Sequence, residues 1–293
     1  MNKLHTMRSE VVNKRREKFR ALHQSECFVI PNPWDVGSAR YLQQLGFAAL
    51  ATTSAGFAFS QGLPDSEVAL SRTESLAYIA EIAASVELPV SADFAGGYGV
   101  EPEEVAESVR LCVATGVAGL SIEDATGDRS APLYELPLAV ERIRAARRAI
   151  DEAGGGVLLT ARAECFHVGH PDALRESIRR LQAYAAAGAD VLFAPGLQYA
   201  EEIKNLVGEV WPKPVNVLVV RDIGLNVSQL AALGVRRISV GGALALAAWG
   251  GFLRAARVLR AEGSFAGFGG AASYAELNEL FEAELRERQS RKT

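Results

Sequence analysis

One short pattern recurs four times along the chain, each time between a helical stretch and an apolar run. A glycine followed by an apolar residue closes the segments 44–47, 114–117, 186–189 and 232–235. Glycine suits this position because it readily adopts the left-handed backbone conformation that ends a helix. The repetition predicts a chain built from successive helix-then-strand units.

Eight candidate strands alternate with amphipathic helical stretches. The strands are the apolar runs 28–31, 48–51, 90–93, 119–122, 158–161, 191–193, 215–218 and 237–240. Between them, apolar residues recur at i, i+3 and i+4 in 72–85, 103–115, 138–152 and 173–187. No Pro- or Ser-rich linker interrupts the series, so we expect an α/β fold, a single (β/α)8 TIM barrel spanning 1–293. A doubly wound sheet is the alternative, but it needs a glycine-rich phosphate loop after the first strand, where 32–35 reads Asn-Pro-Trp-Asp.

Additional helices are expected at both ends of the barrel. Residues 1–25 predict an N-terminal helix, and 243–261 predict the last barrel helix. A C-terminal extension, 264–293, begins with a Gly-rich flexible crossing and continues as a helix over 274–286. A helix beyond a complete barrel needs a surface to pack on, and another subunit is the candidate, so we expect a homo-oligomer, a dimer or tetramer.

Composition narrows the possible partners. The chain is 49% apolar and 23% charged with a net charge of −4, which gives no basic excess for nucleic acid. No apolar segment is long enough for a membrane span, and the start lacks a secretory h-region. Cys27, Cys112 and Cys165 are too widely spaced for a disulfide framework or a zinc pattern. We therefore expect a cytoplasmic protein with a small-molecule ligand.

Charged residues end three of the candidate strands. Asp93 ends the third, Glu123 and Asp124 end the fourth, and Arg162 ends the fifth. In a barrel these ends meet at one mouth. Carboxylates without His or Cys partners favour Mg²⁺, or Mn²⁺, with several waters; the alternative is that the acids cap the following helices.

The other polar residues of this region also allow two interpretations each. Arg162 could clamp a substrate carboxylate, or pair with Glu164 or Glu123 inside the mouth. The hydroxyls and N–H groups of 52–56, which include Thr53 and Ser54, could bind an anion or form a polar turn.

Three further groups are equally ambiguous. Cys165, His167 and His170 could supply a nucleophile, or be a buried thiol and surface histidines. Trp34 could wall the site or simply begin a helix with Asp35. Tyr98 could line the pocket or pack in the core.

Taken together, five segments resemble the isocitrate lyase / phosphoenolpyruvate mutase superfamily over roughly residues 25 to 285. They are Asn32-Pro-Trp-Asp35, Thr52-Thr-Ser54 with Gly62-Leu-Pro-Asp65, Ala92-Asp93 with Gly97-Tyr-Gly99, Ile122-Glu123-Asp124 and Ala161-Arg162. The resemblance implies a barrel, often a tetramer with swapped helices. It also implies Mg²⁺-dependent chemistry on small 2-oxo or 2-hydroxy acids through a metal-stabilised enolate.

Residue roles follow from this resemblance. It implies that Asp93 is a direct metal ligand and that Glu123 binds the metal, often through water. It matches Arg162 to a substrate-binding arginine, Thr53 and Ser54 to an anion cradle, and Asp65 to an acid near the metal. Asp65, Tyr98 and His167 are the candidates for the general acid or base.

Three departures from the family pattern limit the reaction. Ala95 stands where a second acid is usual, and 194–196 lack the glutamate that often follows the sixth strand. The Lys/Cys catalytic loop is replaced by 126–132, which contains neither residue, so isocitrate-type cleavage is disfavoured. We therefore predict a Mg²⁺-dependent lyase of the decarboxylase or retro-aldol type. The alternatives are a phosphonate C–P enzyme, mutase or hydrolase, and a barrel that binds a metabolite without catalysis.

Overall fold

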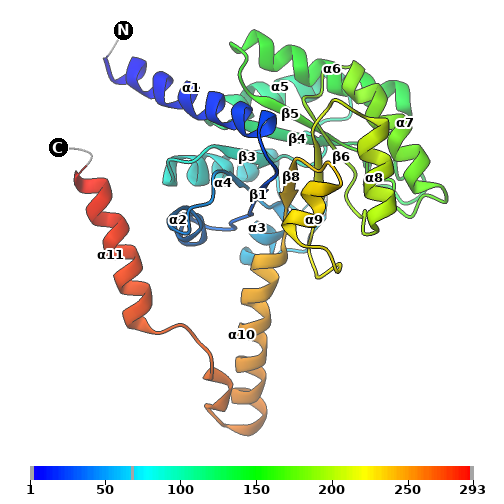
Figure 1. The fold of residues 1–293 in the computed structure, drawn as a ribbon. Helices are drawn as coiled ribbons and strands as arrows, with labels where there is room; N and C mark the ends of the chain where they lie inside the picture. Colours follow the sequence, from blue (N-terminus) through cyan, green and yellow to red (C-terminus); the bar gives the residue numbers. More distant parts are fainter. Residues whose placement is uncertain (1–2, 67–68, 291–293) are drawn as a thin grey trace.

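The computed structural model describes residues 3–66 and 69–290, and it contains one sheet of eight parallel strands (Figure 1). The strands are β1 (Phe28–Ile30), β2 (Leu50–Ala51), β3 (Val90–Asp93), β4 (Gly119–Glu123), β5 (Leu158–Arg162), β6 (Val191–Phe193), β7 (Val215–Leu218) and β8 (Arg237–Ser239). The expected strands are all present, and their bounds shift by no more than two residues.

The sheet curls into a barrel because its first strand pairs with its last. Ile30 of β1 lies in register with Ser239 of β8. The remaining gap, between β1 and β2, is bridged where the Ala51 N–H donates to the Pro31 carbonyl at 3.1 Å. Pairing of β1 with β8 in one continuous series confirms the barrel and rules out the doubly wound alternative.

Helices alternate with the strands as the sequence predicts. They are α1 (Lys3–Gln24), α2 (Val36–Gln44), α3 (Ser54–Ser60), α4 (Arg72–Ser85), α5 (Pro102–Ala114), α6 (Leu136–Glu152), α7 (Ala173–Ala186), α8 (Ala200–Glu209), α9 (Val227–Ala232), α10 (Ala243–Glu262) and α11 (Tyr274–Ser290). A short 3-10 turn, η1 (Ala266–Phe268), interrupts the expected crossing. Gly116 and Gly188 adopt φ values of 91° and 104°, as their position after α5 and α7 requires.

Helix α1 closes the N-terminal end of the barrel. Phe19 is fully buried and clusters with Ile30 and Leu158. A Cβ on Gly119 would lie only 2.6 Å from the Phe19 ring, so the ring fits there because position 119 is glycine. The charged strand ends consequently face the opposite, open mouth.

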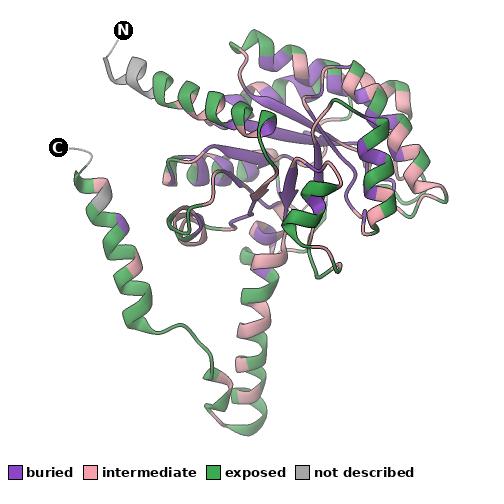
Figure 2. Ribbon diagram, viewed as in Figure 1, coloured by how far each residue is buried: buried purple, intermediate pink, exposed green. Residues whose placement is uncertain are grey.

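The C-terminal helices do not cover this barrel. Helix α10 projects away from it as a long arm, and α11 returns alongside α2 (Figure 1). The arm is mostly exposed, and Ala245 is the one buried residue assigned to α10 among the described residues (Figure 2). The helix expected over 243–261 is present, but only its first residues contact the barrel: Leu244 packs against the core and Leu246 lines the cavity, and the rest extends away from the barrel.

Contacts between α11 and the rest of the chain are few and polar. The Gln44 side chain donates to the Leu280 carbonyl at 3.0 Å, and Arg40 lies 3.7 Å from Glu284. Within the described residues, no helix combines the length and apolarity that crossing a membrane would require.

Candidate active site at the open barrel mouth

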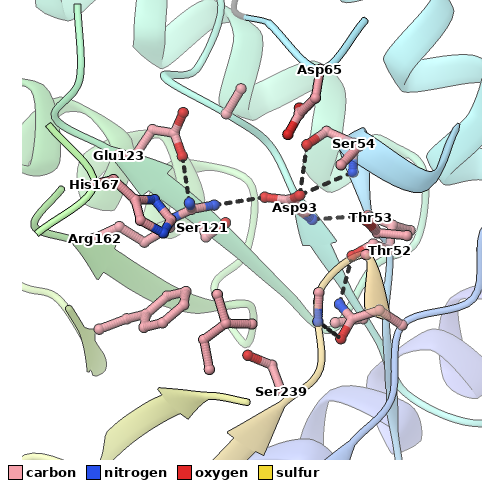
Figure 3. Close-up of a pocket in the computed structure, with 18 of the residues that line it drawn as sticks. Thr52, Thr53, Ser54, Asp65, Asp93, Ser121, Glu123, Arg162, His167 and Ser239 are labelled. Atoms are coloured by element: carbon pink, nitrogen blue, oxygen red, sulfur yellow. Dashed lines mark hydrogen bonds and ion pairs between the residues drawn. The ribbon is translucent and has the colours of Figure 1, made fainter. Parts of the chain in front are cut away.

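A cavity of about 750 Å³ opens at the mouth formed by the C-terminal strand ends. Most of the predicted site residues line it: Thr53, Ser54, Asp65, Asp93, Tyr98, Glu123, Arg162 and His167. Figure 3 shows the side chains of Asp93, Glu123 and Arg162 converging from β3, β4 and β5, with Ser54 and Asp65 reaching the same space from the segments that follow the second strand. The structure thus brings together groups that lie more than a hundred residues apart in the chain.

Asp93 is fixed on both of its carboxylate oxygens. The Ser54 backbone N–H and hydroxyl donate to Oδ2 at 3.0 and 2.8 Å, and Arg162 donates to Oδ1 at 2.9 Å. The Asp93 N–H in turn donates to the Thr52 hydroxyl at 2.9 Å. Asp93 does not cap the next helix, α5, whose N-cap is Glu101, so the capping interpretation is wrong here.

Arg162 is the centre of the charge network. Its Nη1, Nη2 and Nε atoms lie 2.9, 2.9 and 2.7 Å from the carboxylates of Asp93, Glu123 and Glu164. Burial alone would lower the pKa of Arg162, but these three carboxylates outweigh it and raise the pKa. The ion-pair interpretation of Arg162 therefore describes the structure, and a role as substrate clamp stays a prediction.

Glu164 orients two groups that face the cavity. One of its oxygens accepts from Arg162, and the other lies 2.9 Å from Nδ1 of His167. Burial would raise the pKa of Glu164, but Arg162 and His167 lower it. The carboxylate stays ionised and holds both partners in place.

Asp124, in contrast, is a structural group. It is 3% exposed and accepts from Tyr184 and Arg180 at 2.5 and 3.1 Å, and from the Glu164 N–H at 2.9 Å. Burial raises the pKa of Asp124 despite these donors. Through the Glu164 N–H, Asp124 holds the segment that follows β5. It does not cap α6, whose N-cap is Glu135.

The hydroxyl groups of Thr53 and Ser54 already form hydrogen bonds within the protein. Thr53 is the N-cap of α3, and its hydroxyl accepts from the Gly56 N–H at 3.2 Å. Ser54 donates hydrogen bonds from both its backbone N–H and its hydroxyl to Asp93. A substrate anion would have to share these donors.

The loop after β3 carries unusual backbone geometry. Ala95 and Tyr98 adopt φ values of 44° and 55°, the left-handed region that non-glycine residues rarely enter. Arg142 holds this loop by donating to the Gly96 carbonyl and, at 3.1 Å, to the Gly99 carbonyl. Tyr98 both lines the cavity and packs on Phe94, with ring centroids 5.1 Å apart.

Asp65 lies at the cavity edge with a perturbed carboxyl. Burial and the nearby Asp93 raise its pKa, more than Arg162 and His167 lower it. A carboxyl with a raised pKa can carry a proton closer to neutral pH than an ordinary aspartate. Asp65 therefore keeps its place as the acid or base candidate.

Three candidates lie outside the cavity lining. Trp34 precedes the Asp35–Ser38 capping box that begins α2, so it is a helix-start residue and does not contact the cavity. Cys165 is fully buried, and burial raises its pKa to about 11, which excludes a thiolate nucleophile at neutral pH. His170 accepts from the Asp172 N–H at 3.1 Å.

The segment 126–132, which replaces the Lys/Cys loop, is a folded turn. The Thr126 hydroxyl donates to the Ala131 carbonyl at 2.6 Å, and Ser130 donates to Asp128 at 2.8 Å. An isolated bridge between Ala125 and Leu133 closes its base. The turn supplies Thr126 to the cavity wall but no thiol and no amine.

The donor set fits a loosely held Mg²⁺. In the described part of the chain, no group of three His, Cys, Asp or Glu side chains is placed to hold a metal. Mg²⁺ commonly takes only one or two carboxylates and completes its shell with water and substrate. Asp93 and Glu123 are the two predicted carboxylates; each forms an ion pair with Arg162, and their role as metal ligands stays a prediction.

Sequence reasoning missed the polar residues that line the cavity below the mouth. Ser91, Ser121, Asn216, Arg237 and Ser239 occupy inward-facing strand positions and reach the cavity. Polar residues at alternating positions in otherwise apolar strands were the available signal.

Comparison with known proteins agrees with this geometry. A protein of Burkholderia cenocepacia J2315, described as a candidate lyase/mutase, is 47% identical, with 93% of this chain and 98% of that chain covered and a TM-score of 0.89. Oxaloacetate decarboxylase of Chromohalobacter salexigens is 31% identical over 80% of this chain and 81% of its own length. An oxaloacetate acetylhydrolase solved with its product oxalate is 25% identical, with 96% and 99% covered and a TM-score of 0.83. The model of the phosphoenolpyruvate phosphomutase family matches residues 19–260, and the chain belongs to that family.

Proposed function

We propose that this protein is a Mg²⁺-assisted lyase that breaks a C–C bond next to the carbonyl or hydroxyl of a small 2-oxo or 2-hydroxy acid. The observation that carries the proposal is the convergence of Asp93, Glu123 and Arg162 on one cavity. Two of the relatives named above, the decarboxylase and the acetylhydrolase, act on oxaloacetate, a 2-oxo acid, which supports the same substrate class here.

Each residue has a role that its contacts support. Asp93 and Glu123 would hold Mg²⁺, which when bound would stabilise negative charge developing on the substrate oxygen. Arg162 would donate to the substrate carboxylate, while its Nε–H stays on Glu164. Asp65, with its raised pKa, would donate the proton to the enolate carbon left by bond cleavage.

The turn at 126–132 favours decarboxylation or retro-aldol cleavage. Isocitrate-type cleavage in this superfamily uses a thiol on this loop, and phosphonate mutases use a lysine. Neither residue type is present in the segment. Decarboxylation needs stabilisation of the enolate oxygen and one proton donated to the enolate carbon. Retro-aldol cleavage needs, in addition, a base that accepts the hydroxyl proton.

A substrate screen tests the proposal directly. The purified protein is incubated with 2-oxo and 2-hydroxy acids in Mg²⁺, and release of pyruvate or glyoxylate is followed, with and without a chelator. We expect Asp93→Asn to lower kcat/KM at least a thousandfold, because it removes a charge that stabilises the cation. Asp151→Asn, at an exposed position on α6, is the matched control and should retain activity. Undiminished kcat/KM in Asp93→Asn would overturn the assignment.

A second function is favoured by one specific contact. Arg162 already neutralises the two carboxylates that a cation would need, as expected for a barrel that binds a metabolite without catalysis. Calorimetry with oxalate, an enolate mimic, separates the two. Oxalate binding that requires Mg²⁺ supports the lyase, whereas absence of binding at millimolar oxalate with Mg²⁺ supports the non-catalytic barrel.

A further inference from the structure

The barrel interior beneath the mouth is lined by small polar side chains. Barrel interiors are usually filled by branched aliphatic residues. Here Ser91 of β3, Ser121 of β4, Asn216 of β7 and Ser239 of β8 all line the cavity, and each is at least nine-tenths buried. The cavity therefore continues from the mouth into the barrel as a polar pocket.

A buried arginine stands at this lower level. Arg237, on β8, lines the cavity and is 5% exposed. Its Nε donates to Asn216 Oδ1 at 2.8 Å, its Nη2 donates to Thr160 Oγ1 at 3.1 Å, and its Nη1 lies 3.4 Å from His23 Nε2. Because a guanidinium carries five N–H groups, each terminal nitrogen keeps one N–H without an acceptor among the described residues.

None of the partners of Arg237 carries a negative charge. Nδ1 of His23 lies 2.8 Å from the Phe19 carbonyl, which can only accept, so the proton resides on Nδ1 and Nε2 accepts from Arg237. Burial and Arg237 lower the pKa of His23 to about 3, so the ring is neutral at physiological pH. Within residues 3–66 and 69–290 no ion pair involves Arg237, and burial lowers its pKa to about 9.

The surrounding hydroxyls add unused donors. The Ser239 hydroxyl accepts from Asn216 Nδ2 at 2.9 Å and donates to no acceptor in the described chain. The hydroxyl of Ser91 likewise has no hydrogen-bond partner there, although it lines the cavity. A buried cation with an excess of donors and no counter-ion costs free energy unless an anion joins it.

We propose that Arg237, with the hydroxyls of Ser239 and Ser91, forms an anion subsite inside the barrel that accepts one carboxylate group. A guanidinium with one free N–H on each terminal nitrogen can receive both oxygens of a carboxylate. Two sources supply that chemistry: the distal carboxylate of the substrate, or a separate small carboxylate that binds beside it. The first source rests on the proposed function, and the second does not.

The spacing of β5 allows one ligand to reach both sites. Thr160, which holds Arg237, precedes Arg162 by two residues, and both side chains project inward. Two residues of a strand span about 7 Å. A short dicarboxylate along the barrel axis can therefore place its reacting end at Arg162 and its other end at Arg237.

Calorimetry with matched ligands tests the subsite. Glutarate is compared with valerate, which has the same chain length but one carboxylate, in wild type and in Arg237→Met. We expect glutarate to bind wild type at least tenfold more tightly than valerate, and Arg237→Met to abolish that preference. Arg236→Met, at the adjacent position, is the control and should keep it. Equal binding of the two ligands by wild type, with no formate binding either, would overturn the subsite.

Formate separates the two sources. If the anion is a separate carboxylate, formate binds wild type without displacing oxalate, and Arg237→Met loses that binding; if it is the distal end, formate competes with glutarate. Should Arg237→Met fold poorly, judged by its melting temperature, Ser239→Ala replaces it and should weaken glutarate binding severalfold. If oxalate fails to bind with Mg²⁺ but glutarate binding depends on Arg237, the proposed function fails and the subsite stands. If instead oxalate binds with Mg²⁺ but glutarate binding does not depend on Arg237, the subsite fails and the proposed function stands.

Discussion

At the scale of single residues, Arg162 stands out because it forms ion pairs with three carboxylates at once. It is the shared partner of Asp93, Glu123 and Glu164, whose carboxylates would otherwise repel one another in a partly buried mouth. We expect Arg162→Gln to lower the free energy of unfolding by about 3 kcal/mol, because it leaves buried carboxylates uncompensated. The same variant should be stabilised by millimolar Mg²⁺ more than wild type is, since its carboxylates are released.

Thermal unfolding with and without Mg²⁺ measures both effects. Arg144→Gln is a suitable control, because Arg144 pairs with Glu141 on an exposed face of α6, where ion pairs contribute little. A stability loss in Arg162→Gln no larger than in the control would contradict the assigned role.

His23 predicts a defined pH dependence of stability. Its pKa is about 3 in the folded protein and about 6.5 in the unfolded chain. Between these values the unfolded state binds the extra proton, so stability is full above about pH 6.5 and falls as the pH drops toward 3. His23 contributes up to about 1.4 kcal/mol per pH unit to this slope.

Denaturant unfolding from pH 7 to 4 checks this prediction. His23→Gln, which removes the titrating ring, should show a shallower fall of the unfolding free energy than wild type. Parallel curves for the two proteins would show that folding does not lower the pKa of His23.

Residue identity alone predicted where the site residues gather but not how they pair. Asp93, Glu123 and Arg162 stand at strand ends, and barrel geometry brings such ends together. The sequence could not show that Arg162 binds all three neighbouring acids at once, because these distances depend on the shear of the sheet. The sequence left two interpretations of Trp34 open, because an aromatic residue after a strand can wall a site or begin a helix. The structure places Trp34 before the Asp35–Ser38 capping box of α2 and outside the cavity lining.

At the scale of elements, the loop after β3 carries a position that bears on the proposed metal site. Ala95 lines the cavity at φ 44°, where family members commonly carry an acid. Aspartate tolerates this left-handed conformation better than alanine does. We expect Ala95→Asp to add a carboxylate beside Asp93 and to raise Mg²⁺ affinity at least tenfold.

Calorimetric titration with Mg²⁺ measures the change, and Ala95→Asn is the matched control. Asparagine has the same backbone preference but no charge, so it should leave Mg²⁺ affinity near that of wild type. Equal affinities for the Asp and Asn variants would place position 95 outside the cation site.

Strands and barrel helices were predictable because each obeys a local rule. Apolar runs predicted the strands, and the glycines after α5 and α7 predicted where those helices end. The same rules predicted that α10 is a helix but not where it lies. Its apolar positions resemble those of a barrel-covering helix, and periodicity does not indicate which surface an apolar face contacts.

At the scale of the whole molecule, the α10–α11 arm predicts an oligomer. Leu246, Phe252, Leu253 and Leu259 on α10 are each at least 40% exposed. Exposed apolar residues in such a row mark an interaction surface, and a second copy of this chain is the occupant that the arm's length and the expected helix swap favour. Leu246 also lines the cavity, so the arm lies next to the mouth.

Light scattering tests this expectation. The molar mass of wild type should be a multiple of 31.3 kDa. Phe252→Asp combined with Leu253→Asp should shift the protein toward the monomer, because two charges would be buried in the interface. Tyr199→Asp, at an exposed position outside the arm, is the control. A monomeric wild type would exclude the swap.

Phe19 packs against Gly119 and closes the N-terminal end of the barrel, so the cavity opens at the opposite mouth. In the proposed reaction, the substrate would enter and both products would leave through the same mouth. When a bound acid is cut in two, the fragment seated deeper could not pass the one nearer the opening. We therefore expect release in a fixed order, with the shallow fragment first. In steady-state kinetics, the deeper product alone would then compete with the substrate.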